Sequence, residues 1–129
     1  MSPTPDSPSP LKHAADLPSL DAERMDMLRE LCLDAGQDLL RDMLGSWESE
    51  AARHLANAQQ AMTAANQPAL KAAAHAIKGS CGNMGIVRLA ELGRQLEHQV
   101  EVPAEAQALL DEMVAEFNAA REKLAQITV

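Results

Sequence analysis

The segment that follows Pro103 constrains the fold of this chain most strongly. Its apolar side chains recur at alternating intervals of four and three residues, at Ala106, Leu110, Met113, Phe117, Ala120, Leu124 and Ile127. This seven-residue repeat places all of them along one side of an α-helix. Such a stripe is typical of a helix that packs against its neighbours in a bundle. No stretch of the sequence alternates with the period of two that a half-buried strand needs, so no sheet is expected.

The residue types available for a core support the same fold class. The 129 residues include one Trp, one Phe and no Tyr, so the core must be built from Leu, Ala, Met, Val and Ile. Leu, Ala and Met are strong helix formers. The length is that of one domain, which buries somewhat under ~70% of its unfolded surface. The sequence therefore predicts a single all-α domain.

Apolar stripes separated by capping residues divide the chain into five expected helices. Their approximate ranges are 20–33, 35–64, 67–83, 86–101 and 103 onward. Asp34 and Gln37 have the spacing of a capping box that opens the second helix. Asn66 caps the third helix, which should end near Gly82 and Asn83, because both residue types tolerate positive φ. The last four helices pack most simply as an antiparallel four-helix bundle, with the short first helix as a lid over one end.

The N-terminal end differs in composition from the rest. Residues 1–18 hold five of the seven prolines. Because proline lacks a backbone donor and has a fixed φ, this segment is expected to be a disordered tail or linker, and the domain is expected to span 19–129. Within the domain, the first helix should turn an apolar face inward. That face is formed by Met25, Leu28, Leu31 and Cys32.

Charge and cysteine content exclude several classes of function. The net charge is -8 and no Lys/Arg cluster occurs, which disfavours nucleic acid and anionic membranes as partners. There is no apolar run of about 18 residues and no signal peptide. Cys32 and Cys81 are isolated, as expected of reduced thiols in the cytoplasm. The sequence thus predicts a cytoplasmic protein that binds other proteins.

The most unusual local feature is the stretch from His75 to Gly85. On a helix, Leu70, Ala74, Ile77, Cys81 and Met84 share one stripe. His75, Lys78, Gly79 and Gly82 then face the opposite way, toward solvent. Two glycines on an exposed face cost about 1 kcal/mol each relative to alanine, which favours close approach of a partner to the backbone there. A neutral imidazole at that place is a competent nucleophile at pH 7, and Lys78 places an ammonium one turn away on the same face.

This stretch resembles the histidine-containing phosphotransfer (HPt) domain of bacterial phosphorelays. The resemblance lies in His-x-x-Lys-Gly, a glycine six residues later, and Leu-x-x-Leu-Gly-x-x-Leu-Glu. The matching residues are His75, Lys78, Gly79, Gly85, Leu89, Leu92, Leu96 and Glu97. It implies a phosphoacceptor at His75, a phosphate-stabilising cation at Lys78 and a docking face at Gly79 and Gly82. Gly85 would be a structural turn. Position 97 of the family often carries Gln or Glu near the phosphorylation site, so Glu97 could orient His75 or Lys78.

The function implied by the resemblance is that of a phosphoryl carrier. Such a carrier accepts a phosphoryl group from the Asp of one response-regulator receiver domain and passes it to another. The partners would be receiver domains and a hybrid sensor histidine kinase, with Mg²⁺ held by the receiver and no cofactor in this chain. The protein is expected to be a monomer. No ATP-binding or autokinase activity is expected, because no P-loop or Gly-rich nucleotide loop occurs.

Two other functions stay open at this stage. The chain could be a module that sequesters a receiver without accepting phosphate, although His75 and Lys78 together disfavour it. It could also be the dimerisation and phosphoacceptor domain of a sensor kinase, in which Glu or Asp follows the histidine; here Ala76 follows. Metal binding is not expected, because the other histidines, His13, His54 and His98, lack ligand spacing. A hydrolase is equally disfavoured, because no nucleophile elbow is present.

Overall fold

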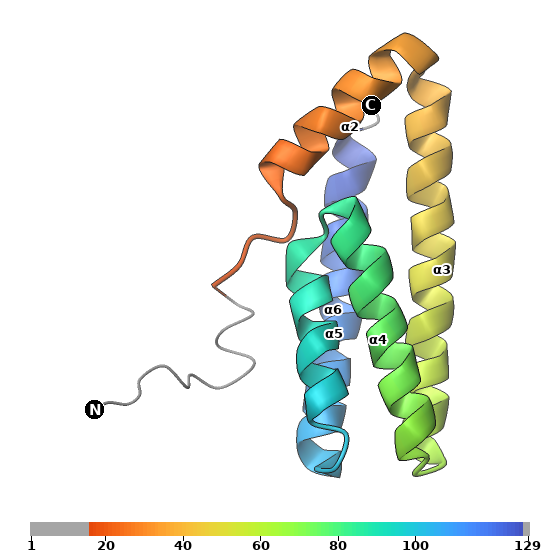
Figure 1. The fold of residues 1–129 in the computed structure, drawn as a ribbon, viewed down its shortest axis with the longest axis vertical. Coiled ribbons are helices and arrows are strands. Elements are labelled where there is room, and N and C mark those ends of the chain that lie inside the picture. Colours follow the sequence, from red (N-terminus) through yellow and green to blue (C-terminus); the bar gives the residue numbers. More distant parts are fainter. Residues whose placement is uncertain (1–15, 128–129) are drawn as a thin grey trace, which may run out of the picture.

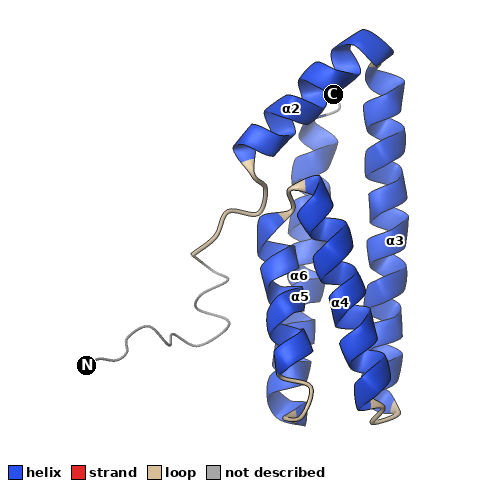
Figure 2. Cartoon of the chain, viewed as in Figure 1, coloured by secondary structure: helices blue, strands red, loops and turns tan. Residues whose placement is uncertain are grey.

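The computed structural model describes residues 16–127, and this range forms five helices (Figure 1). They are α2 (Ala22–Ala35), α3 (Gln37–Thr63), α4 (Gln67–Met84), α5 (Val87–His98) and α6 (Pro103–Ile127). Residues 16–127 contain no strand, and helices account for nearly all of that range (Figure 2). The predicted all-α fold is therefore confirmed. The predicted disordered tail lies mostly outside the described residues, since 1–15 and 128–129 are not described.

Helices α3 to α6 form an antiparallel bundle, and α2 crosses one end of it. In Figure 1 the chain runs down α3, up α4, down α5 and up α6, and each helix lies beside the next. The short turns that join them force this up-and-down order, because a connection of a few residues cannot reach the far end of a helix. The short helix α2 lies obliquely across the end where α3 begins (Figure 1), so the predicted lid is also confirmed.

The bundle core is made of the predicted stripes. Six of the seven positions predicted for α6 are buried, and Ile127 packs partly against the core. In α3 the buried stripe is formed by Leu40, Leu44, Trp47, Ala51, Leu55, Ala58 and Ala61. Trp47 and Phe117, the two aromatic residues, meet between α3 and α6 with their ring centroids 5.5 Å apart. Because the core has few aromatic residues, leucines fill most of it. Alanines lie where the helices approach closely, because their side chains are small.

The ends of two helices differ from the sequence prediction. Asp34 is part of α2, and the N-cap of α3 is Gly36 at φ 96, so the predicted capping box is wrong. Helix α4 does not stop at Gly82 and Asn83; it continues to Met84 and ends at Gly85, which has φ 74. In both cases a later glycine supplied the left-handed backbone that ends or redirects a helix, which is the conformation glycine adopts without steric cost.

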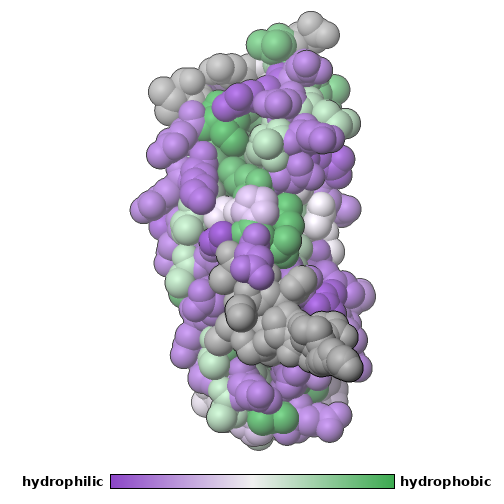
Figure 3. Space-filling view, turned by 90° about the vertical axis from the view of Figure 1, so that its left-hand side faces the viewer, coloured by the Kyte–Doolittle hydropathy of each residue, from purple (hydrophilic) through white to green (hydrophobic). Residues whose placement is uncertain are grey.

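Helix α2 buries a narrower face than predicted. Met25 and Cys32 are buried and Leu28 is partly buried, but Leu31 is 62% exposed, so its predicted inward position is wrong. Because α2 lies obliquely across one end of the bundle, only part of its predicted apolar face contacts the core. Met27 and Leu33 are exposed as well. Figure 3 shows apolar surface among polar side chains in the upper part of the molecule, where α2 lies.

The turn between α4 and α5 is tied to the first turn of α2 and to the segment that precedes it. Both Nε and Nη2 of Arg24 donate to the carbonyl of Asn83, at 3.1 and 2.7 Å. Arg88 donates to the carbonyl of Leu17, which lies inside the predicted tail, and pairs with the buried Glu116. These bonds hold the C-terminal end of α4 and the start of α5 in place. Of the described helices, none has the length and apolar character needed to cross a bilayer.

Candidate functional site

Helix α4 presents His75 at the surface by burying its opposite side. Asn66 caps the helix by accepting from the amide of Ala69 at 3.1 Å, and Pro68 lies in the first turn, where its missing donor costs nothing. The buried residues are Leu70, Ala73, Ala74, Ile77 and Cys81. The side chain of His75 is 66% exposed. The predicted orientation of the helix therefore agrees with the structure.

Helix α5 brings a carboxylate to the histidine. Nδ1 of His75 lies 3.0 Å from Oε2 of Glu97. A carboxylate can only accept, so the proton of the neutral imidazole belongs on Nδ1 when this hydrogen bond forms. Nε2 then keeps its lone pair. Because the ring is exposed, a partner molecule can reach Nε2 while Glu97 holds the other ring nitrogen.

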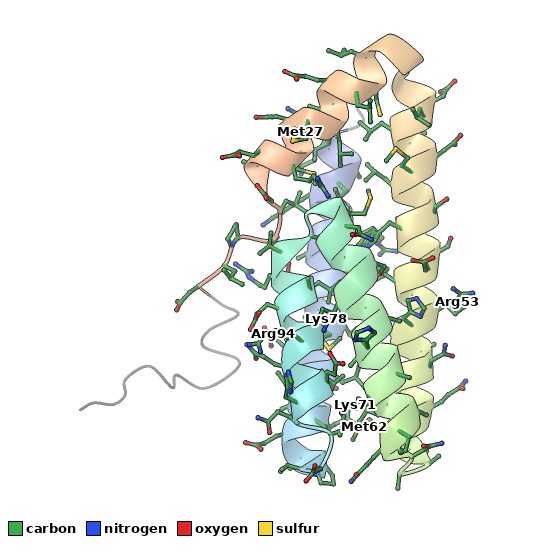
Figure 4. All side chains as sticks on the ribbon, in the orientation of Figure 1. Met27, Arg53, Met62, Lys71, Lys78 and Arg94 are labelled. Carbon is green, nitrogen blue, oxygen red and sulfur yellow. The ribbon has the colours of Figure 1, made fainter. Side chains whose placement is uncertain are left out.

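The same carboxylate also holds Lys78. Nζ of Lys78 forms an ion pair with Oε1 of Glu97 at 3.0 Å, and the Glu97 side chain is only 14% exposed. Lys78 lies between α4 and α5, about midway along the bundle (Figure 4). The ammonium of Lys78, followed by the hydrogen bond from His75, holds the pKa of Glu97 below its ordinary value against the opposing effect of burial. Glu97 is therefore ionised at neutral pH and bridges the two residues.

Two glycines beside the histidine leave open surface. Gly79 and Gly82 are exposed helical residues, and a Cβ added to either would meet no atom within 4 Å. Their lack of a side chain is therefore not required by packing. Gly85 is different, because a Cβ there would lie 2.6 Å from Cγ of Arg24 and its φ is 74. Gly85 serves the turn, and the two exposed glycines lower the surface around His75.

Within residues 16–127, the other histidines and the buried thiol of Cys81 do not join this group. Cys81 is buried, accepts a hydrogen bond from Nε1 of Trp47 at 3.4 Å, and burial raises its pKa to about 11, so it stays a thiol. His98 is exposed at the end of α5, and His54 lines a groove between α3 and α4. Among residues 16–127, no three His, Cys, Asp or Glu side chains are grouped in a way that could hold a metal ion.

The site is thus an exposed imidazole with a free Nε2, an adjacent ammonium and an open surface around both. Because the side chain of His75 is mostly exposed, a group carried on another macromolecule or a freely diffusing small molecule can reach it. A nucleophilic nitrogen next to a cation suits an anionic electrophile such as a phosphoryl group. The fold and site together define a helical bundle that presents an exposed histidine beside a cation.

Comparison with known proteins places the chain in a family. The family model described as the Hpt domain matches residues 42–123, and the chain belongs to this family. It is similar to histidine-containing phosphotransfer protein B (HptB) from Pseudomonas aeruginosa PAO1, whose crystal structure superposes with a TM-score of 0.75 at 28% sequence identity. That match covers 86% of this chain and 95% of the other. Among curated proteins no match was found. The chain is therefore a histidine phosphotransfer protein of phosphorelay signalling and acts with other phosphorelay proteins.

Sequence reasoning missed two features of this site. It gave Glu97 only a possible role in orienting His75 or Lys78, whereas the side chain is mostly buried and contacts both residues. It also assigned no role to Gly93, the glycine of the Leu-x-x-Leu-Gly-x-x-Leu-Glu pattern, which is buried on α5. The sequence did contain a signal for this close packing. Gly93 lies one helical turn before the charged Glu97, and a glycine on a buried helix face marks the close approach of two backbones.

Proposed function

We propose that His75 is the phosphoacceptor and that Nε2 is the reacting atom. The observation that carries this proposal is the hydrogen bond between Nδ1 and Glu97, which leaves Nε2 unprotonated and exposed. Nε2 attacks the phosphorus of an aspartyl phosphate on a receiver domain. The P–O bond to the aspartyl oxygen breaks, the carboxylate leaves, and a P–N bond forms. The proton on Nδ1 stays in the hydrogen bond to Glu97, and transfer to a second receiver reverses these steps.

Lys78 and Glu97 have separate roles in this scheme. A phosphoryl group on Nε2 adds nearly two negative charges to the surface. Lys78, one helical turn from His75, is the cation available to offset them, and its flexible stem lets Nζ turn from Glu97 toward the phosphoryl oxygens. Glu97 orients the imidazole and stabilises the cationic ring that forms when Nε2 is phosphorylated. An acceptor-only carboxylate cannot itself donate to the phosphoryl group.

The open surface at Gly79 and Gly82 is where we place the docking receiver. A receiver must bring its phosphorylated Asp to within about 3–3.5 Å of Nε2, which requires low relief around His75. The exposed α4 face supports this, since an added Cβ would project into solvent at either glycine. The Mg²⁺ needed for the transfer belongs to the receiver. Receiver domains and a hybrid sensor histidine kinase are the proposed partners, and the proposed state is a monomeric cytoplasmic carrier.

We further propose that the chain is a carrier without kinase activity of its own. The sequence has no P-loop or other Gly-rich nucleotide loop, so the phosphoryl group must come from a partner. A module that only sequesters a receiver would have no use for a hydrogen bond that selects one imidazole tautomer. The exposed His75 with its Glu97 and Lys78 partners therefore favours the carrier.

Transfer of label from a phosphorylated receiver domain tests this function. Wild-type protein should take up ³²P in a form that is acid-labile and alkali-stable, as expected of a P–N bond. His75→Gln should take up none, whereas His54→Gln and His98→Gln, the matched controls, should be labelled like wild type. Gel filtration separates the sensor-kinase alternative, because that domain would elute as a dimer. Labelling of His75→Gln at the wild-type rate would refute the assignment.

A further inference from the structure

Gly93 of α5 lies directly against the backbone of α4. It is buried, and a Cβ built on it would lie 3.1 Å from the amide nitrogen of Lys78 and 3.2 Å from the carbonyl oxygen of Ala74. A third contact, at 3.4 Å, is with Cγ2 of Ile77. The two shortest contacts are with backbone atoms, which cannot rotate out of the way as a side chain can. Any residue with a Cβ at position 93 therefore has to move one helix away from the other.

The backbone atoms that Gly93 faces belong to the turn that carries His75. In an α-helix the amide of residue 78 donates to the carbonyl of residue 74, so the two atoms nearest to Gly93 are hydrogen-bonded to each other. His75 lies within the turn that this bond closes. The closest approach of α5 to α4 is thus made at the helical turn of the proposed nucleophile.

Glu97 follows Gly93 by four residues on the same helix. At this spacing the two residues share one face and are separated by one turn, or about 6 Å along the axis. The side chain of Glu97 is short, and it must still reach across to α4. It does so twice, with 3.0 Å to Nδ1 of His75 and 3.0 Å to Nζ of Lys78. Both distances depend on the separation of α4 and α5 at this level.

We propose that Gly93 is a positioning residue, whose missing side chain lets α5 approach α4 closely enough for Glu97 to hold His75 and Lys78 together. The proposal rests on the function proposed above for His75. A Cβ at position 93 forces its neighbours apart by a few tenths of an ångström. That displacement lengthens both contacts of Glu97 at once, because they cross the same interface. Gly93 touches neither the phosphoryl group nor the partner and acts only through Glu97.

Gly93→Ala tests the proposal, with Gly45→Ala as the matched control. Gly45 is an exposed residue of α3 where an added Cβ meets nothing within 4 Å, so the control carries the same helix-propensity change without the helix displacement. Circular dichroism should show both variants folded. In Gly93→Ala, ¹⁵N NMR of the His75 ring should show a smaller fraction of the Nδ1–H tautomer. The carboxyl ¹³C titration of Glu97 should move up in pH, toward the ordinary value, because Lys78 and His75 hold its pKa down less strongly. Gly45→Ala should show neither change.

Reactivity is measured with phosphoramidate, a small phosphoryl donor that needs no receiver. Nε2 attacks phosphorus, the P–N bond of the donor breaks and ammonia leaves. If a misplacement of about 1 Å costs ~100-fold, a shift of about 0.3 Å predicts roughly fourfold slower phosphorylation of Gly93→Ala. In a Glu97→Ala background, Gly93→Ala should cause no further slowing, because the residue through which it acts is already gone.

Three results would overturn the proposal. One is a folded Gly93→Ala protein with unchanged tautomer and Glu97 titration. Another is that Gly93→Ala slows phosphorylation by the same factor in the Glu97→Ala background as in the wild-type background. The third is failure of Gly93→Ala to fold, which would show that the whole bundle requires Gly93. The NMR readouts do not depend on phosphorylation. Wild-type protein that neither phosphoramidate nor a phosphorylated receiver labels at His75 would therefore refute the proposed function and leave the positioning role to be decided by the spectra.

Discussion

Replacement of Glu97 by alanine is expected to leave the bundle folded and to slow phosphoryl transfer to His75. The carboxylate accepts from Nδ1 of His75 and forms an ion pair with Lys78, each at 3.0 Å. Alanine removes both contacts and keeps the Cβ, so the packing of α5 on α4 is preserved. The imidazole then loses the group that selects its Nδ1–H tautomer and holds its plane.

The magnitude follows from the contacts that are lost. A hydrogen bond to a charged group contributes about 1.5–3 kcal/mol. If that contribution is fully expressed in the transition state, the rate of transfer falls by about 10- to 150-fold, since ~1.4 kcal/mol corresponds to a factor of ten. The effect on stability is smaller. Both partners of Glu97 are partly exposed, and such ion pairs contribute about 0–1 kcal/mol, so the free energy of unfolding should change by no more than about 1 kcal/mol.

Glu97→Gln separates orientation from charge. Glutamine keeps an oxygen that can accept from Nδ1 and loses the negative charge that attracts Lys78. If orientation of the ring dominates, Glu97→Gln should transfer within a few-fold of wild type, while Glu97→Ala is slow. The assay is single-turnover transfer from a ³²P-labelled receiver, with urea unfolding to measure stability. Glu97→Ala that transfers at the wild-type rate would refute the orienting role of this carboxylate.

Three further predictions use neighbouring residues. Gly79→Arg should keep or raise the melting temperature, because position 79 is open, and should sharply reduce transfer by holding the receiver away; unfolding of this variant would mean that Gly79 is a packing residue. Lys78→Ala should slow transfer more than it weakens receiver binding. It should also raise the pKa of Glu97, since Lys78 is the main cause of its lowering. Because a lowered carboxyl pKa contributes stability that is present above the unfolded pKa and is lost as pH falls through the folded pKa, the acid-side loss of stability should shrink in Lys78→Ala; an unchanged profile would contradict this. Gly85→Ala should lower the free energy of unfolding by about 1–3 kcal/mol, because it combines positive φ with a Cβ 2.6 Å from Cγ of Arg24, and wild-type stability in urea would show that the turn relaxes.

The sequence alone determined which side of each bundle helix faces the core. The seven-residue repeat of α6 and the stripe through Leu70, Ile77 and Cys81 in α4 are local patterns with the period of the helix itself. Burial of apolar side chains then requires these faces to meet, whatever the exact crossing angles are. For the same reason the exposure of His75 on the opposite side of α4 could be predicted before any tertiary structure was known.

The positions of the helix ends and the burial of α2 depend on tertiary contacts and not on the local sequence pattern. Gly82, Asn83 and Gly85 are all residues that can end a helix, and the sequence does not rank them. Arg24 of α2 donates to the carbonyl of Asn83 and packs over Gly85. The helix thus ends at the glycine that a distant segment of the chain contacts. Leu31 is exposed because α2 lies across the end of the bundle, a placement that no periodicity within α2 encodes.

The arrangement of the site itself depended on tertiary structure. His75 and Glu97 are 22 residues apart on different helices, so their contact depends on where α5 crosses α4 and at what distance. That distance is set by backbone contacts at Gly93, which involve residues 74 and 78 of the other helix. The sequence thus determined that a histidine and a lysine would face solvent on an all-α bundle. Only the packing of α5 on α4 decided that one mostly buried carboxylate would hold both, because helix separation is a property of the pair and not of either helix.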